Sequence, residues 1–154
     1  MSATKLGQWL KQHDWVITTA ESCTGGGVAQ AITDVAGSSA WFHGGFVTYS
    51  NDMKKHLLGV HGHTLTEHGA VSEACVIEMA QGALAQSGAD MAVSVSGIAG
   101  PDGGSEDKPV GTVWFGLAMT ADVAATLGQP QAKAICKHFD GDRQSVRANA
   151  VAFL

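Results

Sequence analysis

The sequence is short of charge, and of positive charge above all. Lys and Arg number nine against 14 Asp and Glu, and charged residues make up only 15% of the 154-residue chain. The net charge is −5 and the pI is near 5.7. A nucleic-acid-binding face needs clustered basic residues, and so does a surface that binds anionic lipids. We therefore expect neither a nucleic-acid partner nor a membrane partner.

Long hydrophobic runs and paired cysteines are also missing. No apolar run approaches the roughly 18 residues that span a membrane, and the segment Met1–Lys5 lacks the apolar region of a signal peptide. The three cysteines are odd in number and show no CxxC spacing, which argues against a disulfide framework. We expect a cytoplasmic protein with free thiols, and we expect Cys75 and Cys136, in apolar surroundings, to be core residues.

What the chain does have is material for one well-filled core. Hydrophobic residues make up 45% of the sequence, which favours a compact globule over disorder. The length predicts a single domain spanning residues 1–154. Four tryptophans and a lightly charged surface favour a homo-oligomer. The helical pattern that starts at Asp142 still runs at Leu154, so we expect the sequence to end inside this helix.

Strand-like and helix-like segments alternate along the chain. This alternation predicts an α/β fold in which helices cover both faces of a sheet. Only a loop is expected between the last two strands, so we expect them to pair antiparallel. The expected strands are 15–20, 44–50, 91–96, 112–119 and 133–139, and the expected helices are 6–10, 26–34, 51–58, 72–86 and one from 142 onward.

The turn from Glu21 to Gly27 joins the first strand to a helix and contains several potentially reactive side chains. Ser22, Cys23 and Thr24 precede three glycines there. One interpretation is structural, because Ser and Thr are preferred N-caps and glycine permits a tight turn. The other is catalytic, because such a turn holds a nucleophile and directs backbone N–H groups at an anion.

Tyr49 and Lys54 are the candidate partners of Ser22. Tyr49 is the single tyrosine, at the end of the second expected strand, and Lys54 follows one helical turn later. Because the carboxyl ends of parallel strands lie at the same edge of a sheet, these residues are expected to meet Ser22. A desolvated lysine is a competent base for a hydroxyl nucleophile. The structural alternative is that Lys54 and Lys55 are both solvated surface residues.

Two further features are candidates for binding a phosphate. The loop Gly97–Pro109 is long and glycine-rich, and loops of this length inside a domain are often functional. Arg143 stands at a helix start, where a phosphate finds both a guanidinium and backbone donors. A surface loop and an exposed surface arginine are the structural alternatives.

Metal binding is not expected. Histidines gather at positions 43, 56, 61, 63 and 68, but their spacing matches no zinc motif and acidic partners are sparse. We expect these histidines on the surface, and we expect no cofactor.

Several ordered motifs together resemble the CinA C-terminal-domain family. They are Ala20–Gly26, Gly37–Phe42, Tyr49–Asn51 with Lys54, Leu58–Val60, His68–Ser72, Gly97–Gly104, Lys108–Val113 and Gly141–Arg143. The likeness covers nearly the whole chain. It implies a three-layer α/β/α sandwich with a mixed, largely parallel sheet.

The resemblance also implies an activity. Members of this family hydrolyse the carboxamide of nicotinamide mononucleotide (NMN), releasing nicotinic acid mononucleotide and ammonia, in pyridine nucleotide salvage without a metal. The family's serine, lysine and tyrosine correspond to Ser22, Lys54 and Tyr49. The predicted substrate-binding residues come from the turn, the long loop and the last helix: Cys23, Thr24, Gly25, Gly26, Gly97, Gly100, Gly103, Gly104 and Arg143.

Two alternatives remain open at this stage. Cys23 is an alternative nucleophile, because a thiol is intrinsically more nucleophilic and a helix N-terminus lowers its pKa. No histidine is obviously placed to pair with it. The other alternative is a non-catalytic nucleotide-binding module or a competence-related interaction module, suggested by the glycine-rich loops and the family's link with competence.

Overall fold

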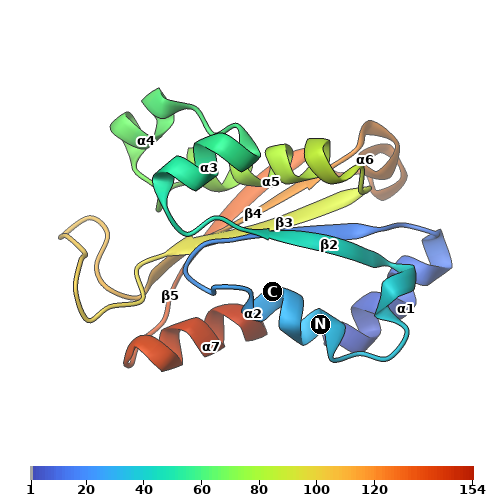
Figure 1. Cartoon of the computed structure of the whole chain (residues 1–154), viewed down its shortest axis with the longest axis horizontal. Helices are drawn as coiled ribbons and strands as arrows, with labels where there is room; N and C mark the ends of the chain where they lie inside the picture. Colours follow the sequence, from blue (N-terminus) through green and yellow to red (C-terminus); the bar gives the residue numbers. More distant parts are fainter. Residues whose placement is uncertain (1) are drawn as a thin grey trace.

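The computed structural model describes residues 2–154, which form one five-stranded sheet in the order β2-β1-β3-β4-β5 (Figure 1). The strands are β1 (Ile17–Glu21), β2 (Phe42–Val47), β3 (Met91–Gly97), β4 (Thr112–Met119) and β5 (Ala132–His138). Strand β1 runs parallel to β2 and β3, whereas β4 is antiparallel to β3 and β5. The mixed sheet and the antiparallel final pair are confirmed. Two of the four pairings are parallel, so parallel pairing has an equal share and not the larger one.

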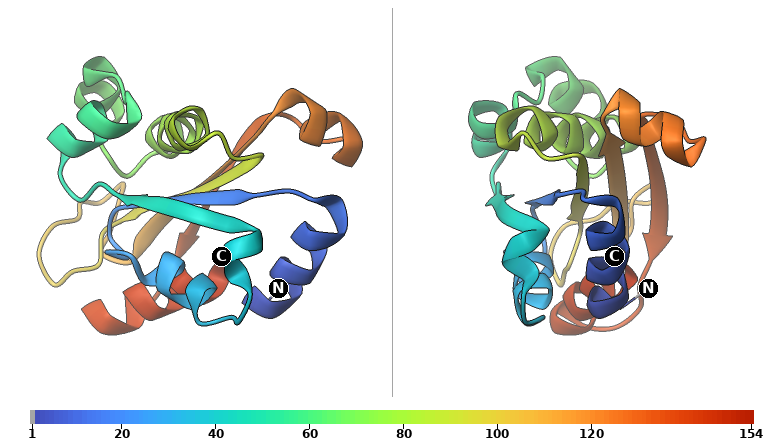
Figure 2. Two further views of the ribbon diagram at one scale, coloured as in Figure 1. Left: turned by 45° about the vertical axis from the view of Figure 1, so that its right-hand side comes forward. Right: turned by 90° about the vertical axis from the view of Figure 1, so that its right-hand side faces the viewer.

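Helices cover both faces of the sheet, which confirms the three-layer α/β/α sandwich (Figures 1 and 2). One layer holds α1 (Ala3–His13), α2 (Gly27–Thr33) and α7 (Arg143–Phe153). The other layer holds α3 (Asn51–Leu58), α4 (Gly62–His68), α5 (Glu73–Ser87) and α6 (Ala121–Leu127). Helix α6 corrects the expectation of a plain loop between β4 and β5. Within residues 2–154 no helix is long and apolar enough to cross a bilayer.

Each face of the sheet buries a different kind of side chain. Toward α1, α2 and α7 the strands present large residues such as Ile17, Val113 and Phe115. Toward α5 they present small ones, and a Cβ placed on Gly116 would lie 2.5 Å from the backbone oxygen of Val76. Helix α5 therefore packs close against the centre of the sheet.

The sheet order places a crevice at the carboxyl end of β1. After β1 the chain passes through α2 to β2 on one side, and it later returns to β3 on the other side. Such a switch point leaves an opening beyond the strand ends, where α/β proteins bind ligands. Ser22 follows β1, Tyr49 lies just beyond β2, and Gly97 ends β3. The structure thus brings the ends of β1 and β2, expected to meet, together with the end of β3.

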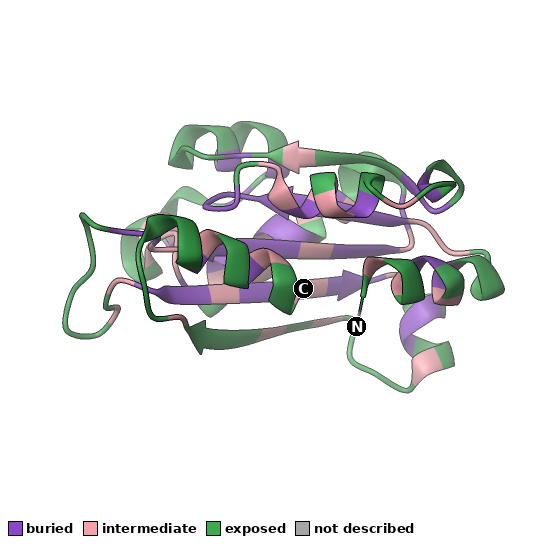
Figure 3. Ribbon diagram, turned by 90° about the horizontal axis from the view of Figure 1, so that it is seen from below, coloured by how far each residue is buried: buried purple, intermediate pink, exposed green. Residues whose placement is uncertain are grey.

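The outer strands are the exposed part of the sheet. Most of β2 and β5 is exposed or half-buried, whereas the central strands are buried (Figure 3). Cys23 and Cys75 are buried and Cys136 is exposed, and all three thiols are free. The core position expected for Cys136 is therefore wrong, because β5 is an outer strand.

Candidate active site

A cavity of about 280 Å³ opens at this switch point. Its walls contain most of the predicted site residues, namely Ser22, Cys23, Tyr49, Lys54, Gly97, Gly100 and Arg143. The remaining lining residues are not among the predicted site residues, although all except Ser96 lie in the family motifs: Asn51, Ala70, Val71, Ser96, Ile98, Ala99 and Asp102. The residues Thr24, Gly25, Gly26, Gly103 and Gly104 do not line it.

Ser22 and Lys54 form the polar centre of the cavity. The Nζ atom of Lys54 donates to Ser22 Oγ at 3.0 Å and to the backbone oxygen of Tyr49 at 3.0 Å. The Ser22 hydroxyl lies 3.5 Å from the same backbone oxygen. Ser22 is 7% exposed and Lys54 is 1% exposed. A hydroxyl in direct contact with a buried amine is an arrangement in which a lysine can activate a serine.

Helix α3 fixes Lys54 in this position. The Ser50 hydroxyl accepts the backbone N–H of Met53 at 3.1 Å and caps the helix. At its other end α3 lies directly on α5, since a Cβ on Gly82 would approach Leu58 O within 1.8 Å. The residue at position 54 is therefore enclosed between two helices and the sheet edge.

The two adjacent lysines have different environments. Lys55 points to the surface and forms an exposed ion pair with Asp52 at 3.6 Å. Burial lowers the pKa of Lys54 below the 10.5 of an exposed lysine. Lys54 is therefore neutral more often than an exposed lysine, which suits a group that accepts a proton.

Cys23 has the opposite electrostatic character. Burial raises the pKa of its thiol to about 11, against weaker opposing effects from nearby amides and from the charge of Arg147. The thiol is therefore protonated at neutral pH. Because the thiolate is the nucleophilic form, this pKa disfavours Cys23 as the attacking group.

Glu21 stabilises the turn Glu21–Gly27 through hydrogen bonds of its buried carboxylate. Its carboxylate, 1% exposed, accepts the Thr24 hydroxyl at 2.6 Å and the backbone N–H groups of Val28 and Ala29 at 2.8 and 3.0 Å. The residue at the N-cap of α2, Gly26, makes no side-chain cap. The expected cap by a hydroxyl of the turn is therefore wrong, since a buried carboxylate takes its place.

Two backbone amides remain beside the serine. Backbone hydrogen bonding at Cys23 and Gly97 lowers the pKa of the Cys23 thiol against the larger effect of burial, and both residues line the cavity. Gly97 has no room for a side chain, since a Cβ there would lie 2.7 Å from a methyl carbon of Val113. The close approach of β4 thus requires glycine at the end of β3. Backbone N–H groups of residues that line the cavity next to Ser22 are suited to binding a negatively charged oxygen.

Arg143 joins three segments at the cavity mouth. Its guanidinium donates to the Gly100 backbone oxygen at 2.7 Å and to the Tyr49 hydroxyl at 2.9 Å. The Tyr49 side chain is 62% exposed. It is the tyrosine's backbone oxygen that contacts Ser22 and Lys54, while its hydroxyl contacts the arginine. The structure thus places the Tyr49 hydroxyl against Arg143 and not against Ser22 or Lys54.

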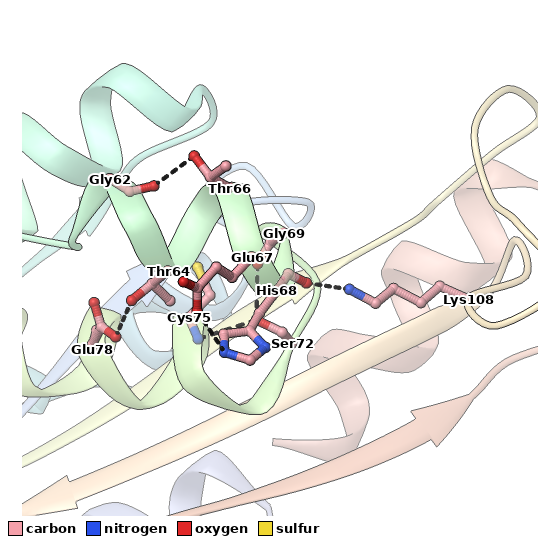
Figure 4. Close-up of polar contacts among 10 residues, drawn as sticks. All are labelled: Gly62, Thr64, Thr66, Glu67, His68, Gly69, Ser72, Cys75, Glu78 and Lys108. Atoms are coloured by element: carbon pink, nitrogen blue, oxygen red, sulfur yellow. Dashed lines mark hydrogen bonds and ion pairs between the residues drawn. The ribbon is translucent and has the colours of Figure 1, made fainter.

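The long loop is anchored on the opposite side of the cavity. The Lys108 ammonium donates to the backbone oxygen of His68 at the end of α4 (Figure 4). Helix α4 is in turn held to α5, because Thr64 donates to Glu78 at 2.7 Å. Gly103 and Gly104 shape the bend of the loop at φ +86° and +88°. These contacts hold the loop in place as a wall of the cavity.

The histidines do not converge on a metal site. No group of three or more His, Cys, Asp or Glu residues within the described part, 2–154, lies close enough to hold a metal ion. His61 is instead bonded to Glu78 through both its backbone N–H and its ring, each at 2.9 Å.

Comparison with known proteins identifies a family and several close relatives of this chain. The family model described as the CinA C-terminal domain matches residues 1–153. The chain is 57% identical over 149 residues to the nicotinamide-nucleotide amidohydrolase PncC of Escherichia coli K12, covering 97% of this chain and 86% of that protein. It is 52% identical to the protein of the same name from Pseudomonas putida, covering 97% and 88%.

Solved structures agree with the sequence comparison. A competence damage-inducible protein from Klebsiella pneumoniae superposes with a TM-score of 0.89 at 42% identity, over 98% of this chain and 88% of that one. A competence/damage-inducible protein from Agrobacterium tumefaciens gives 0.88 at 41% identity, over 98% and 87%.

Proposed function

Because the chain belongs to the CinA C-terminal domain family, we propose that it is a nicotinamide-nucleotide amidohydrolase that converts NMN to nicotinic acid mononucleotide and ammonia. The observation that carries the proposal is the buried hydrogen bond of 3.0 Å between Lys54 Nζ and Ser22 Oγ, at the wall of a cavity of about 280 Å³. The substrate is inferred from the names of the relatives, and the reaction type is inferred from the groups that line the cavity.

The reaction begins at the serine. Ser22 Oγ attacks the carboxamide carbon while neutral Lys54 takes the hydroxyl proton. The carbonyl oxygen becomes an oxyanion, which accepts hydrogen bonds from the Cys23 and Gly97 amides. One such donor contributes about 3 kcal/mol to the stability of the transition state.

Lys54 then returns the proton. The C–N bond breaks, the leaving nitrogen receives the proton from Lys54, and ammonia departs. The acyl-enzyme on Ser22 remains. Lys54 next removes a proton from a water molecule that attacks the ester carbon. The bond between Ser22 Oγ and this carbon then breaks as Lys54 gives the proton to Oγ, which yields the carboxylic acid and restores Ser22 and neutral Lys54. The sum is one amide and one water converted to one acid and one ammonia, with only side chains and amides of the chain as catalysts.

The charges at the cavity mouth match the charges of the nucleotide. NMN carries a cationic pyridinium ring and an anionic phosphate. Arg143 uses two of its donors on Gly100 and Tyr49 and retains others for a phosphate. Asp102 is the one acidic residue among the lining residues, and its carboxylate complements the pyridinium. The exposed ring of Tyr49 offers a face to the same cation.

One assay separates this proposal from a binding module. Purified protein is incubated with NMN without added metal, and ammonia and nicotinic acid mononucleotide are quantified together. Equal amounts of both products support the amidase. Saturable NMN binding with neither product supports the non-catalytic module instead.

A further inference from the structure

Arg147, in the last helix of the chain, contacts the turn Glu21–Gly27. Its Nε atom donates to the backbone oxygen of Cys23 at 3.0 Å, and Nη2 donates to that of Thr24 at 3.4 Å. Helix α7, which carries this arginine, lies beside α2 beneath the sheet (Figures 1 and 2). A half-buried guanidinium thus binds two successive carbonyl groups of the turn.

The turn leaves space for this contact. Gly25 has φ +60°, and a Cβ at that position would lie 3.3 Å from Arg147 Nη2. A larger residue at position 25 would adopt a strained backbone and crowd the guanidinium. Glycine at this position therefore serves the arginine contact, although Gly25 does not line the cavity.

Arg147 forms no ion pair with the acidic residues of the described segment, 2–154. Its charge is directed at peptide carbonyls instead. The effect reaches the turn, because the guanidinium opposes the larger influence of burial on the pKa of the Cys23 thiol.

The hydrogen bonds form a chain that ends in the cavity. Arg147 donates to the oxygen of Thr24, and the N–H of the same peptide unit, on Gly25, donates to the oxygen of Ser22 at 3.1 Å. The N–H of the peptide unit that carries the Ser22 oxygen belongs to Cys23, a residue that lines the cavity. In a planar trans peptide the C=O and N–H groups point in opposite directions. Hydrogen bonds in series therefore fix the orientation of successive peptides and polarise one another.

We propose that Arg147 is a positioning residue that orients and polarises the Cys23 amide as a donor to the oxyanion formed on Ser22. This inference rests on the proposed amidase function. It predicts an effect on the transition state and little effect on the bound substrate, since the oxyanion exists only after attack.

The first test replaces Arg147 by Met, which keeps an unbranched apolar stem and removes the guanidinium donors. We expect kcat for NMN to fall about 10- to 100-fold with KM changed less than about twofold. Lys133→Met, which removes an exposed positive charge, is the matched control and keeps both constants. In a Ser22→Ala background, calorimetry is expected to give the same NMN affinity with and without Arg147→Met.

The second test is rescue. Arg147→Ala leaves space, so guanidinium ion at millimolar concentration is expected to restore part of kcat, whereas Arg147→Met is not rescued. A scaffold role alone would lower thermal stability without this split between kcat and KM. Unchanged kcat in Arg147→Met, or a loss that guanidinium does not restore in Arg147→Ala, overturns the proposal.

A third readout does not require NMN. A fluorophosphonate reacts with Ser22 by forming an Oγ–P bond and expelling fluoride while Lys54 takes the hydroxyl proton, and its phosphoryl oxygen occupies the oxyanion position. Arg147→Met is expected to slow this labelling about 10-fold or more. Failure of the NMN assay in the unmodified protein would refute the proposed function, while the labelling rate would still decide the role of Arg147.

Discussion

Lys54 Nζ lies 3.0 Å from Ser22 Oγ in a side chain that is only 1% exposed. A neutral amine in this place accepts the serine proton, whereas an ammonium only donates. The protonation state of Lys54 therefore controls whether Ser22 is a nucleophile, and the following predictions test that dependence and the rest of the site.

The first prediction concerns pH. Burial lowers the pKa of Lys54 below 10.5, and the neutral form is the active one. We expect kcat/KM for NMN to rise with pH and to level off below pH 10.5. A fall in kcat/KM with rising pH over the same range would mean that the charged lysine is required.

The same shift affects folding stability. The folded protein binds the Lys54 proton less tightly than the unfolded chain, so the free energy of unfolding from this group rises with pH between the folded and unfolded pKa values. The stability that comes from this shift is present in full above the pKa of Lys54 in the unfolded chain. It is lost as the pH falls through the pKa of Lys54 in the folded protein. Denaturant titrations of the protein and of Lys54→Met across this range measure it.

The second prediction compares neighbouring lysines. Lys54→Met removes the base, and we expect kcat to fall about 100-fold or more. Its thermal midpoint is expected to stay equal or increase, because a buried amine is replaced by an apolar chain. Lys55→Met, which breaks only an exposed ion pair with Asp52, is the control and keeps its activity. Equal losses in the two variants would refute the assignment.

The third prediction addresses the thiol. Because the pKa of Cys23 is raised to about 11, the thiol is protonated and unreactive at neutral pH. Cys23→Ser is expected to retain hydrolysis of NMN, and iodoacetamide is expected to modify the thiol slowly at pH 7. Loss of turnover in a folded Cys23→Ser protein would return the nucleophile role to the cysteine.

The fourth prediction separates phosphate binding from chemistry. Arg143→Ala removes charge-assisted donors, so KM for NMN is expected to rise about 10- to 100-fold. KM for nicotinamide riboside, which lacks the phosphate, is expected to change much less. Similar changes for both substrates would assign Arg143 to holding Gly100 and Tyr49 in place, the contacts that it makes in the structure.

The sequence predicts the framework of the site well. Its strand pattern places the ends of β1, β2 and β3 at one edge, and the spacing from Tyr49 to Lys54 places a lysine one turn into the next helix. The hydrophobic pattern locates the strands, and the carboxyl ends of parallel strands lie at the same edge of the sheet. The position of the site can therefore be predicted from the sequence.

Contacts between distant segments account for the rest. The cap on α2 comes from Glu21, which accepts the N–H groups of Val28 and Ala29 from before the turn, outside the usual N-cap pattern. Arg147 lies more than a hundred residues from Cys23, and no local pattern relates the two. The direction of the Tyr49 hydroxyl likewise depends on Arg143 in the last helix. Homo-oligomerisation and a cytoplasmic location stay predictions.

The most direct measurement is ammonia release from NMN by the unmodified protein and by Ser22→Ala, side by side at equal concentration. Ser22 makes one side-chain contact with Lys54 in the cavity, so loss of its hydroxyl is expected to leave the fold and NMN binding intact. The account predicts one ammonia for each NMN consumed by the unmodified protein and background release by Ser22→Ala. Near-normal ammonia release by Ser22→Ala would contradict it.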